Sequence, residues 1–329
     1  MRYSTNEDKK MSDIFGGDVN VNALSEDLQT IRDYLRWAAS RFLEAEIFYG
    51  HGTDSAWDEA VHLVLQALYL PLDIDNRILD ARLTHLERQK VIKWVYRRVV
   101  DRVPLPYLTK TSWFAGMKFY VDQRVIVPRS PIGELIRNEF EPWVNHSNVQ
   151  CVLDLCTGSG CIGIASAQVF IDAKVVLSDI SEDALAVAAR NIKQHNVEKR
   201  VTTVHSDLFT ALTGQKFDLI ISNPPYVDME NLASMPQEYL KEPALGLGSG
   251  EDGLEIARKI LVEAIDYLNK DGVLIVEVGN SQYALQEAFQ MVPFTWLNFE
   301  DGGDSVFLLT YDELFAYQSI FKEDFKDAR

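Results

Sequence analysis

One segment of the 329-residue sequence leaves little choice of fold: VLDLCTGSGCIGIASAQVF, from Val152 to Phe170. Its two apolar runs, separated by a glycine-rich turn, predict a buried strand followed by a helix. Gly158, Gly160 and Gly163 fit the pattern G-x-G-x-x-G. Glycines at these positions permit a tight turn, the approach of a ligand to the backbone and close packing of the helix. The pattern indicates a site for an adenosine cofactor, without separating a nicotinamide nucleotide from other adenosine compounds.

After Arg129 the apolar runs alternate with segments of helical periodicity, as in a doubly wound α/β sheet. We expect strands over residues 150–155, 174–178, 201–205, 217–222, 272–278, 295–299 and 305–311. The last two strands flank EDGGD, a hairpin turn, so this seven-stranded sheet should end in an antiparallel strand. In a sheet of order 3-2-1-4-5 the fourth strand lies beside the first, so the ends of both strands face one crevice.

The length of the chain and a change of pattern near residue 110 predict two domains. Before residue 104 the pattern is helical, and Ser55 with Asp58 and Thr84 with Glu87 are typical helix starts. We therefore divide the chain into a flexible tail (1–20), a small helical domain (21–110), a β-hairpin linker (111–130), an α/β domain (131–315) and a frayed C-terminal tail (316–329).

Acidic residues follow the next two strands of the predicted sheet. Asp179, in VVLSDIS, is placed to accept hydrogen bonds from both hydroxyls of a ribose. It could also cap the helix that begins in SEDAL, and that role does not exclude ribose binding. Asp207, in VHSDLF, could reach an adenine edge, with Leu208 or Phe209 against the ring. Asp154, inside the first strand, is expected to support the site from behind or to contact an amino-acid group.

The fourth strand ends in a stiff segment, Asn223-Pro224-Pro225-Tyr226. The Asn223 side chain and the Pro224 carbonyl are two acceptors, and the prolines fix their positions because φ of each ring is locked. Tyr226 supplies a flat face. Two fixed acceptors and an aromatic face suit a planar –NH2 group, whose lone pair they would aim at an electrophile. A merely rigid loop is the alternative, although two prolines after a central strand are unusual.

The composition disfavours several functions. The formal net charge of −17 argues against duplex DNA as the main partner. The sequence has no apolar run of about 18 residues and begins with a polar segment, so we expect a cytoplasmic protein. Three cysteines, Cys151, Cys156 and Cys161, predict neither disulfides nor a metal site. The basic helix Arg88–Arg102 could contact RNA, although a solvated helix face is the commoner explanation.

The pairing of LDLCTGSGCIG with SNPPYVD resembles the class I, Rossmann-like methyltransferases that use S-adenosylmethionine, in the branch acting on planar amino groups. DNA adenine methyltransferases often have Asp before the two prolines, whereas HemK-type protein glutamine methyltransferases typically have Asn-Pro-Pro-Tyr. The helical domain, the hairpin and the segments EPALGLGSGEDGLEIARKIL and VLIVEVGNSQ resemble the second group. This resemblance covers nearly everything after residue 20. VPRSPIGEL and Cys156 resemble the members that act on large-subunit ribosomal protein L-three, rather than those that act on release factors.

The resemblance implies that S-adenosylmethionine is the cofactor, that no metal is needed and that the methyl group goes to a glutamine side-chain amide. The implied cofactor-binding residues are Asp154, Cys156, Thr157, Gly158, Ser159, Gly160, Asp179, Asp207, Leu208 and Asn223. The implied catalytic residues are Asn223 and Pro224, which would hold the amide, with Pro225 and with Tyr226 stacked on it. Glu277 is expected to be a satisfied strand residue.

The implied partner is ribosomal protein L-three, or a pre-ribosomal assembly containing it, with residues 21–110 as the substrate-recognition domain and 131–315 as the methyltransferase domain. Several alternatives remain open at this point. A release-factor glutamine methyltransferase and a nucleic-acid adenine methyltransferase share the chemistry. A nicotinamide oxidoreductase would leave Asn223 to Tyr226 unexplained, and an inactive binding protein would be expected to have lost the glycines or Asn223.

Overall fold

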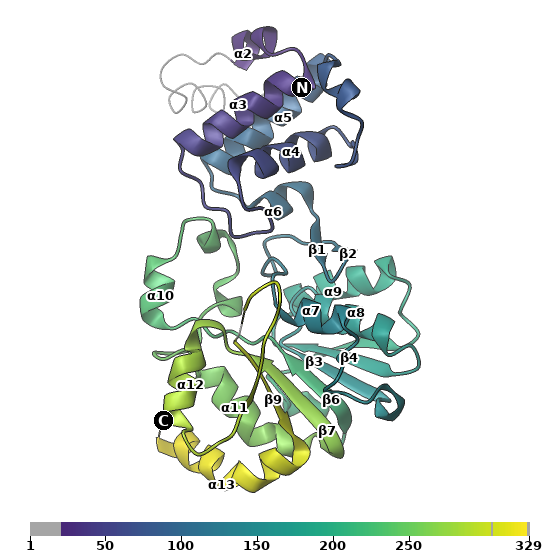
Figure 1. Cartoon of the computed structure of the whole chain (residues 1–329), viewed down its shortest axis with the longest axis vertical. Coiled ribbons are helices and arrows are strands. Elements are labelled where there is room, and N and C mark those ends of the chain that lie inside the picture. Colours follow the sequence, from purple (N-terminus) through teal and green to yellow (C-terminus); the bar gives the residue numbers. More distant parts are fainter. Residues whose placement is uncertain (1–20, 304, 328–329) are drawn as a thin grey trace. The chain divides into compact units, whose positions relative to one another are not determined.

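The computed structural model of the protein describes residues 21–303 and 305–327. The expected flexible tail, residues 1–20, lies outside the described residues. The chain divides into two compact units (Figure 1). A helical unit ends at Lys110 and also includes Pro236–Lys241, and a larger unit contains Thr111–Met235 and the chain from Glu242 onward. The return of six residues near position 240 to the helical unit was not predicted from the sequence.

The helical unit is built from short helices around an apolar core. Its helices are α2 (Val21–Asp27), α3 (Ile31–Glu44), α4 (Ala56–Ala67), α5 (His85–Val99) and α6 (Leu105–Thr109). Helices α3, α4 and α5 pack on one another through buried side chains that include Tyr34, Leu35, Ala60, Leu63, Val91 and Val95. Their apolar residues recur at helical spacing, so each helix buries one face.

Both predicted helix starts in this unit are confirmed. The Ser55 hydroxyl accepts the Asp58 N–H at 3.2 Å, and α4 begins at the next residue. Thr84 and Glu87 form a complete capping box at the start of α5. Thr30 and Asp33 form another complete capping box, before α3, which was not predicted from the sequence. These caps satisfy N–H groups that have no partner within the helix.

The basic residues of α5 act largely inside the helical unit. Arg88 donates to the carbonyls of Leu83 and Ser25, and Lys90 donates to that of Ala67. Arg98 is 1% exposed and is bound to acidic side chains of the same unit. RNA contact through the helix Arg88–Arg102 therefore stays a prediction, and much of the stripe on which it rested is occupied by internal hydrogen bonds.

The larger unit contains the seven-stranded sheet. Its order is β5-β4-β3-β6-β7-β9-β8, with β9 antiparallel to both of its neighbours. The strands are β3 (Cys151–Leu155), β4 (Lys174–Asp179), β5 (Val201–His205), β6 (Phe217–Ser222), β7 (Leu268–Glu277), β8 (Thr295–Leu297) and β9 (Val306–Thr310). The predicted strands, the antiparallel end and the position of the fourth strand beside the first are confirmed. Strand β7 begins at Leu268, earlier than expected, because its polar first residues hid the start.

Helices cover both faces of this sheet (Figure 1). One face packs against α7 (Ile132–Arg137), α8 (Cys161–Val169) and α9 (Glu182–Gln194), and the other against α11 (Glu255–Glu263), α12 (Gln282–Ala288) and α13 (Tyr311–Asp327). Consecutive strand residues serve opposite faces: Val152 belongs to the first core and Leu153 to the second. A strand that is buried on both faces reads as a continuous apolar run, which explains why the sequence showed these strands clearly.

The expected C-terminal tail is wrong, because residues 316–327 continue helix α13. Leu314 and Phe321, seven residues apart on one face of α13, are buried in the second core. Helix α13 packs on α11 and β7. Charged residues on its outer face gave the segment the composition of a frayed end and concealed the apolar stripe.

The hairpin of the linker is shorter than predicted. Strands β1 (Ser112–Phe114) and β2 (Met117–Phe119) pair antiparallel across Ala115 and Gly116, which both have positive φ. Residues 120–130 continue without joining a sheet. The Asp122 carboxylate accepts hydrogen bonds from Tyr120 and Arg124 and turns the chain there.

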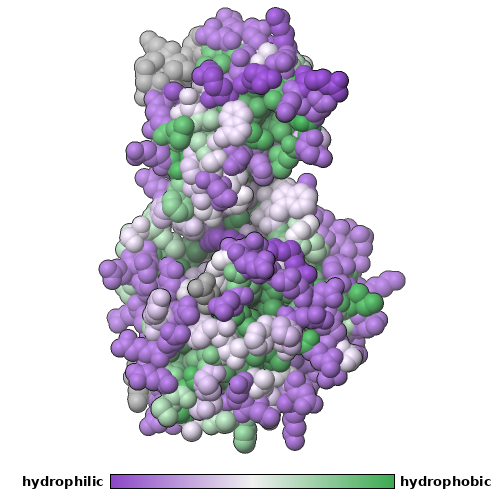
Figure 2. All heavy atoms as spheres, viewed as in Figure 1, coloured by the Kyte–Doolittle hydropathy of each residue, from purple (hydrophilic) through white to green (hydrophobic). Residues whose placement is uncertain are grey.

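Figure 2 shows hydrophilic residues over most of the visible face of each unit, with hydrophobic residues exposed between them. Among the helices in the described ranges, none is both long and apolar enough to cross a membrane.

Burial of Phe321 predicts that α13 is part of the fold rather than an accessory. Phe321→Ala should lower the free energy of unfolding by about 3–5 kcal/mol, because it leaves a cavity in the second core. Phe315→Ala, in the same helix at a position 68% exposed, should change it by less than about 1 kcal/mol. Urea denaturation of both variants measures the difference. Equal unfolding free energies of the two variants would support the expected frayed tail instead.

Candidate active site

The glycine turn lies between the end of β3 at Leu155 and the start of α8 at Cys161. Gly158 and Gly160 have φ of +55° and +81°, values that favour glycine. Cys156 also has positive φ, +60°, which costs a non-glycine residue about 1–2 kcal/mol. A Cβ on Gly163 would lie 2.1 Å from the Leu177 side chain, so only glycine lets α8 approach the sheet this closely.

Asp154 supports this turn from below. It is fully buried, and one carboxylate oxygen accepts the Thr157 hydroxyl at 2.5 Å and the Gly163 N–H at 2.8 Å. The other oxygen has no hydrogen-bond partner among the described residues. Burial raises the pKa of Asp154 to about 7, against the opposing effect of these two donors. Asp154 thus connects the strand, the turn and the helix without reaching the pocket.

Asp179, at the end of β4, holds the turn from the side. Its carboxylate accepts the Gly158 N–H at 2.8 Å and the Ser181 N–H at 2.9 Å. Burial raises the pKa of Asp179, and these N–H groups work against that rise. The helix cap that the sequence allowed for Asp179 belongs to Ser181, whose hydroxyl accepts the Ala184 N–H at the start of α9. Asp179 keeps free lone pairs on both oxygens for further donors.

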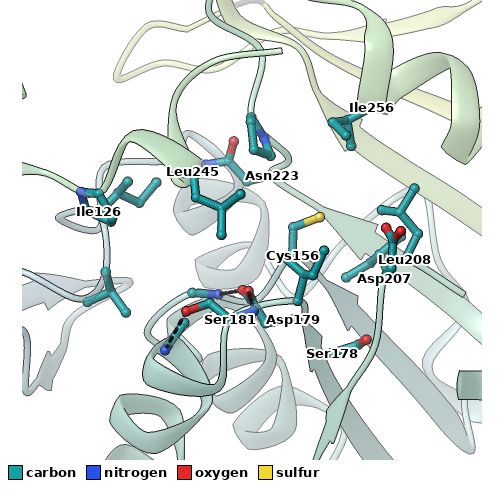
Figure 3. A pocket seen from close by; sticks show the side chains of 18 of the residues that line it. Ile126, Cys156, Ser178, Asp179, Ser181, Asp207, Leu208, Asn223, Leu245 and Ile256 are labelled. Carbon is teal, nitrogen blue, oxygen red and sulfur yellow. Dashed lines mark hydrogen bonds between the residues drawn. The ribbon is translucent and has the colours of Figure 1, made fainter. Parts of the chain in front are cut away.

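A pocket opens above the carboxyl ends of β3, β4, β5 and β6 (Figure 3). Of the predicted cofactor residues it brings together Cys156, Gly158, Asp179, Asp207, Leu208 and Asn223. The others, Asp154, Thr157, Ser159 and Gly160, do not line it and form the support of the turn. This is the position at which open α/β sheets bind their ligands.

Sequence reasoning missed several residues that line the pocket. Ile126 from the linker, Leu245 and Gly246 from the EPALGLG segment, and Ile256 from α11 all line it. Figure 3 shows Ile126 and Leu245 at one end, and Ile256 near Asp207 and Leu208 at the other. The available signal was the EPALGLG segment itself, to which no role had been assigned.

Asn223 follows directly after β6 and enters the pocket half-buried. Its side-chain oxygen is buried and has no hydrogen-bond partner among the described residues. Ser222, one residue earlier, donates to the Leu155 carbonyl at 2.7 Å and so ties the ends of β6 and β3 together. A buried acceptor without a donor is costly unless a ligand supplies one. Pro225 also lines the pocket, whereas Pro224 and Tyr226 do not.

Tyr226 is held rigidly behind Asn223. Its hydroxyl donates to Glu277 at 3.0 Å, and Ser281 donates to its carbonyl at 2.7 Å. Its ring lies against Gly279, where a Cβ would approach the ring to 2.1 Å. Glu277 is buried, burial raises its pKa, and its second oxygen accepts the Ser130 hydroxyl at 2.5 Å. Glu277 is thus a satisfied strand residue that also orients Tyr226.

The raised pKa of Asp154 predicts a pH dependence. The folded-state pKa of about 7 lies above the ordinary value of 3.8, so the unfolded chain releases this proton first as the pH rises. The contribution of protonated Asp154 to the free energy of unfolding is present in full below about pH 4. It is lost progressively as the pH rises to about 7.

Asp154→Asn removes that proton equilibrium. Between pH 5 and pH 8 the wild type should lose on the order of 2 kcal/mol of unfolding free energy relative to the variant. Denaturation of both proteins at the two pH values measures this difference. Parallel stability curves for the two proteins would contradict a raised pKa.

Comparisons with known proteins found a matching family model and named sequence relatives. A family model described as "Methyltransferase small domain" matches residues 142–295. The ribosomal protein uL3 glutamine methyltransferase of Francisella tularensis is 58% identical over 301 residues, covering 91% of this chain and 96% of that protein. The protein of the same name from Neisseria gonorrhoeae is 49% identical over 294 residues, covering 89% and 98%.

A solved structure of a methyltransferase from Pyrococcus furiosus is similar with a TM-score of 0.42 and 19% identity, over 59% of this chain and 90% of that one. The predicted methyltransferase domain and its place in the HemK-like group are confirmed by the sequence relatives. Since uL3 is ribosomal protein L-three, the predicted branch is confirmed as well. The chain belongs to the family of ribosomal protein uL3 glutamine methyltransferases.

Proposed function

We propose that this chain transfers a methyl group from S-adenosylmethionine to the side-chain amide nitrogen of a glutamine in ribosomal protein uL3. The buried, unpartnered oxygen of Asn223 in the pocket is the observation that carries the proposal. It is a buried acceptor for which the described residues supply no donor, so a bound ligand can supply one. The names of the two relatives support a uL3 glutamine as the side chain whose amide N–H group donates to Asn223.

The residues present fit S-adenosylmethionine. A Cβ on Gly158 would meet nothing within 4 Å, so the backbone of the turn has open space beside it. Asp179 would accept the ribose hydroxyls, Asp207 and Leu208 would contact the adenine, and the turn from Cys156 would contact the methionine part. The bound cofactor would supply a methyl group on a sulfonium, which is already a good leaving group.

The segment from Asn223 to Tyr226 would hold the glutamine amide. The Asn223 oxygen and the Pro224 carbonyl each accept one N–H of the –NH2 group, so that its nitrogen lone pair points at the methyl group. Pro224 and Pro225 keep these acceptors in place because their φ angles are fixed. Tyr226, held by Glu277, would restrict the orientation of the amide plane. Fixed acceptors lower the barrier because they need no reorganisation during the reaction.

Asn223→Ala tests the role of the unpartnered oxygen. It should reduce the transfer rate about 100- to 1,000-fold, because one preorganised polar partner is lost at the reacting group. Calorimetry should show that the variant still binds S-adenosylhomocysteine. Asn231→Ala, at an exposed asparagine of the following helix, is the control and should keep the wild-type rate. Asn223→Asp should retain more activity than Asn223→Ala, since it keeps the acceptor, and equal rates of Asn223→Ala and wild type would remove Asn223 from the mechanism.

The substrate is tested in cells that lack the enzyme. Mass spectrometry of uL3 should show one glutamine lighter by a methyl group, and expression of the wild type should restore it. Loss of the methyl group from release factors instead would assign the chain to the other glutamine methyltransferase branch. Incubation of purified enzyme with free uL3 and with a pre-ribosomal particle then identifies which form is the acceptor.

A further inference from the structure

A loop begins and ends beside the Asn223–Tyr226 segment. The chain leaves after Val227, forms α10 (Met229–Ser234) and returns near Gly248. The Val227 N–H donates to the Leu247 carbonyl, and the Ser249 N–H donates to the Val227 carbonyl, both at 2.9 Å. We call residues 228–248 the strap. Its two ends are closed by these hydrogen bonds one residue after Tyr226.

The returning part of the strap forms a wall of the cofactor pocket. Leu245 and Gly246 line the pocket, and a Cβ on Gly246 would lie 2.8 Å from the Ile126 side chain. Glu242, whose side chain is fully buried, fixes this wall to the linker. Its carboxylate accepts two N–H groups of Arg129, at 2.6 and 2.7 Å, and the Val127 N–H at 3.0 Å.

The middle of the strap, Pro236–Lys241, belongs to the helical unit. Glu238 is 2% exposed there. One of its oxygens accepts the Phe48 N–H at 3.1 Å and is bound by Arg98 at 3.2 Å and by Arg102 at 3.3 Å. Burial opposes ionisation of Glu238, yet the Phe48 N–H and the Arg98 charge lower its pKa below the ordinary value.

The buried Arg98 side chain has a second partner. It binds Glu59 of α4 at 2.5 Å and donates to the Phe48 carbonyl at 2.7 Å. Two buried carboxylates therefore share one guanidinium, but only Glu238 lies on the strap. Buried ion pairs rarely stabilise a fold more than apolar packing would, whereas loss of one partner costs about 3–5 kcal/mol. What such a pair supplies is a fixed geometry.

The distance along the chain from this anchor to the pocket wall is short. Glu238 and Glu242 are four residues apart, and four residues span at most about 14 Å when fully extended. Leu245 follows Glu242 by three residues. The short connection can therefore accommodate little displacement of Glu238 before Leu245 moves. The strap is thus held by one buried glutamate in each unit, and the pocket wall follows the second glutamate directly.

We propose that Glu238 is a positioning residue for the active site, which sets the place of the pocket wall at Leu245 and Gly246 by anchoring the strap in the helical unit. The consequence for methyl transfer rests on the proposed function. The effect on the pocket wall does not, so the two are measured separately.

Glu238→Gln in the full chain is the test, and Glu59→Gln is the matched control. Both remove a buried carboxylate charge from Arg98, but Glu59 lies on α4. Hydrogen exchange should speed up about 10-fold or more at the amides of Val227, Leu247 and Ser249 in Glu238→Gln. Calorimetry should show S-adenosylhomocysteine binding weakened about 10-fold, a difference of 1.4 kcal/mol. Both quantities should stay within about 3-fold of wild type in Glu59→Gln.

The proposal fails if Glu238→Gln melts the helical unit at lower temperature but leaves exchange at the strap and cofactor binding unchanged. It also fails if Glu59→Gln produces the same changes as Glu238→Gln, since the strap would then have no special part. If Glu238→Gln does not fold, Glu238→Asp replaces it, because the aspartate side chain is one methylene shorter and moves the charge away from Arg98. The same two quantities, hydrogen exchange and S-adenosylhomocysteine binding, are then measured. If Glu238→Gln shows the expected faster exchange and weaker binding but the wild-type enzyme does not methylate uL3, the positioning role of Glu238 is supported and the proposed substrate is wrong.

Discussion

The carboxylate of Asp154 beneath the glycine turn is the contact on which the rest of the site depends. One of its oxygens binds the Thr157 hydroxyl and the Gly163 N–H, so strand β3, the turn and helix α8 are joined at one atom. Within the turn, the Gly158 N–H donates to Asp179 at the end of the neighbouring strand β4. The pocket floor therefore includes backbone groups in positive-φ conformations, held by the buried Asp154 and the half-buried Asp179.

Local signals in the sequence predicted most of the fold. Doubly buried strands such as β3 and β6 read as apolar runs, and helix caps at Ser55 and Thr84 mark positions that depend only on neighbouring residues. Helix α13 was missed because its buried residues, such as Phe321, are diluted by charged ones on the outer face. Periodicity was the reliable signal there, and composition misled.

The site was predicted less completely, for a physical reason. Residues on strand ends, such as Asp179 and Asn223, are placed by the sheet order, which the sequence revealed. Ile126 and Leu245 are placed by long-range ion pairs, since Arg129 and Glu242 are 113 residues apart. Arg98 and Glu238 are separated by 140 residues. No local pattern records which arginine a glutamate will meet, so the strap and its partition between the two units could not be read from one sequence.

The place of β9 in the sheet has a consequence for how the protein is made. This strand lies between β7 and β8 although it comes after both in the chain. Until residues 306–310 leave the ribosome, β7 has no partner on that side and its backbone N–H and C=O groups stay open to pairing with other chains. The nascent enzyme must therefore keep a nearly complete sheet unsealed while residues 278–305 are synthesised, a period in which aggregation competes with folding. The final strand and α13 end that period together, because the same short stretch supplies both the missing strand and the helix that packs on β7.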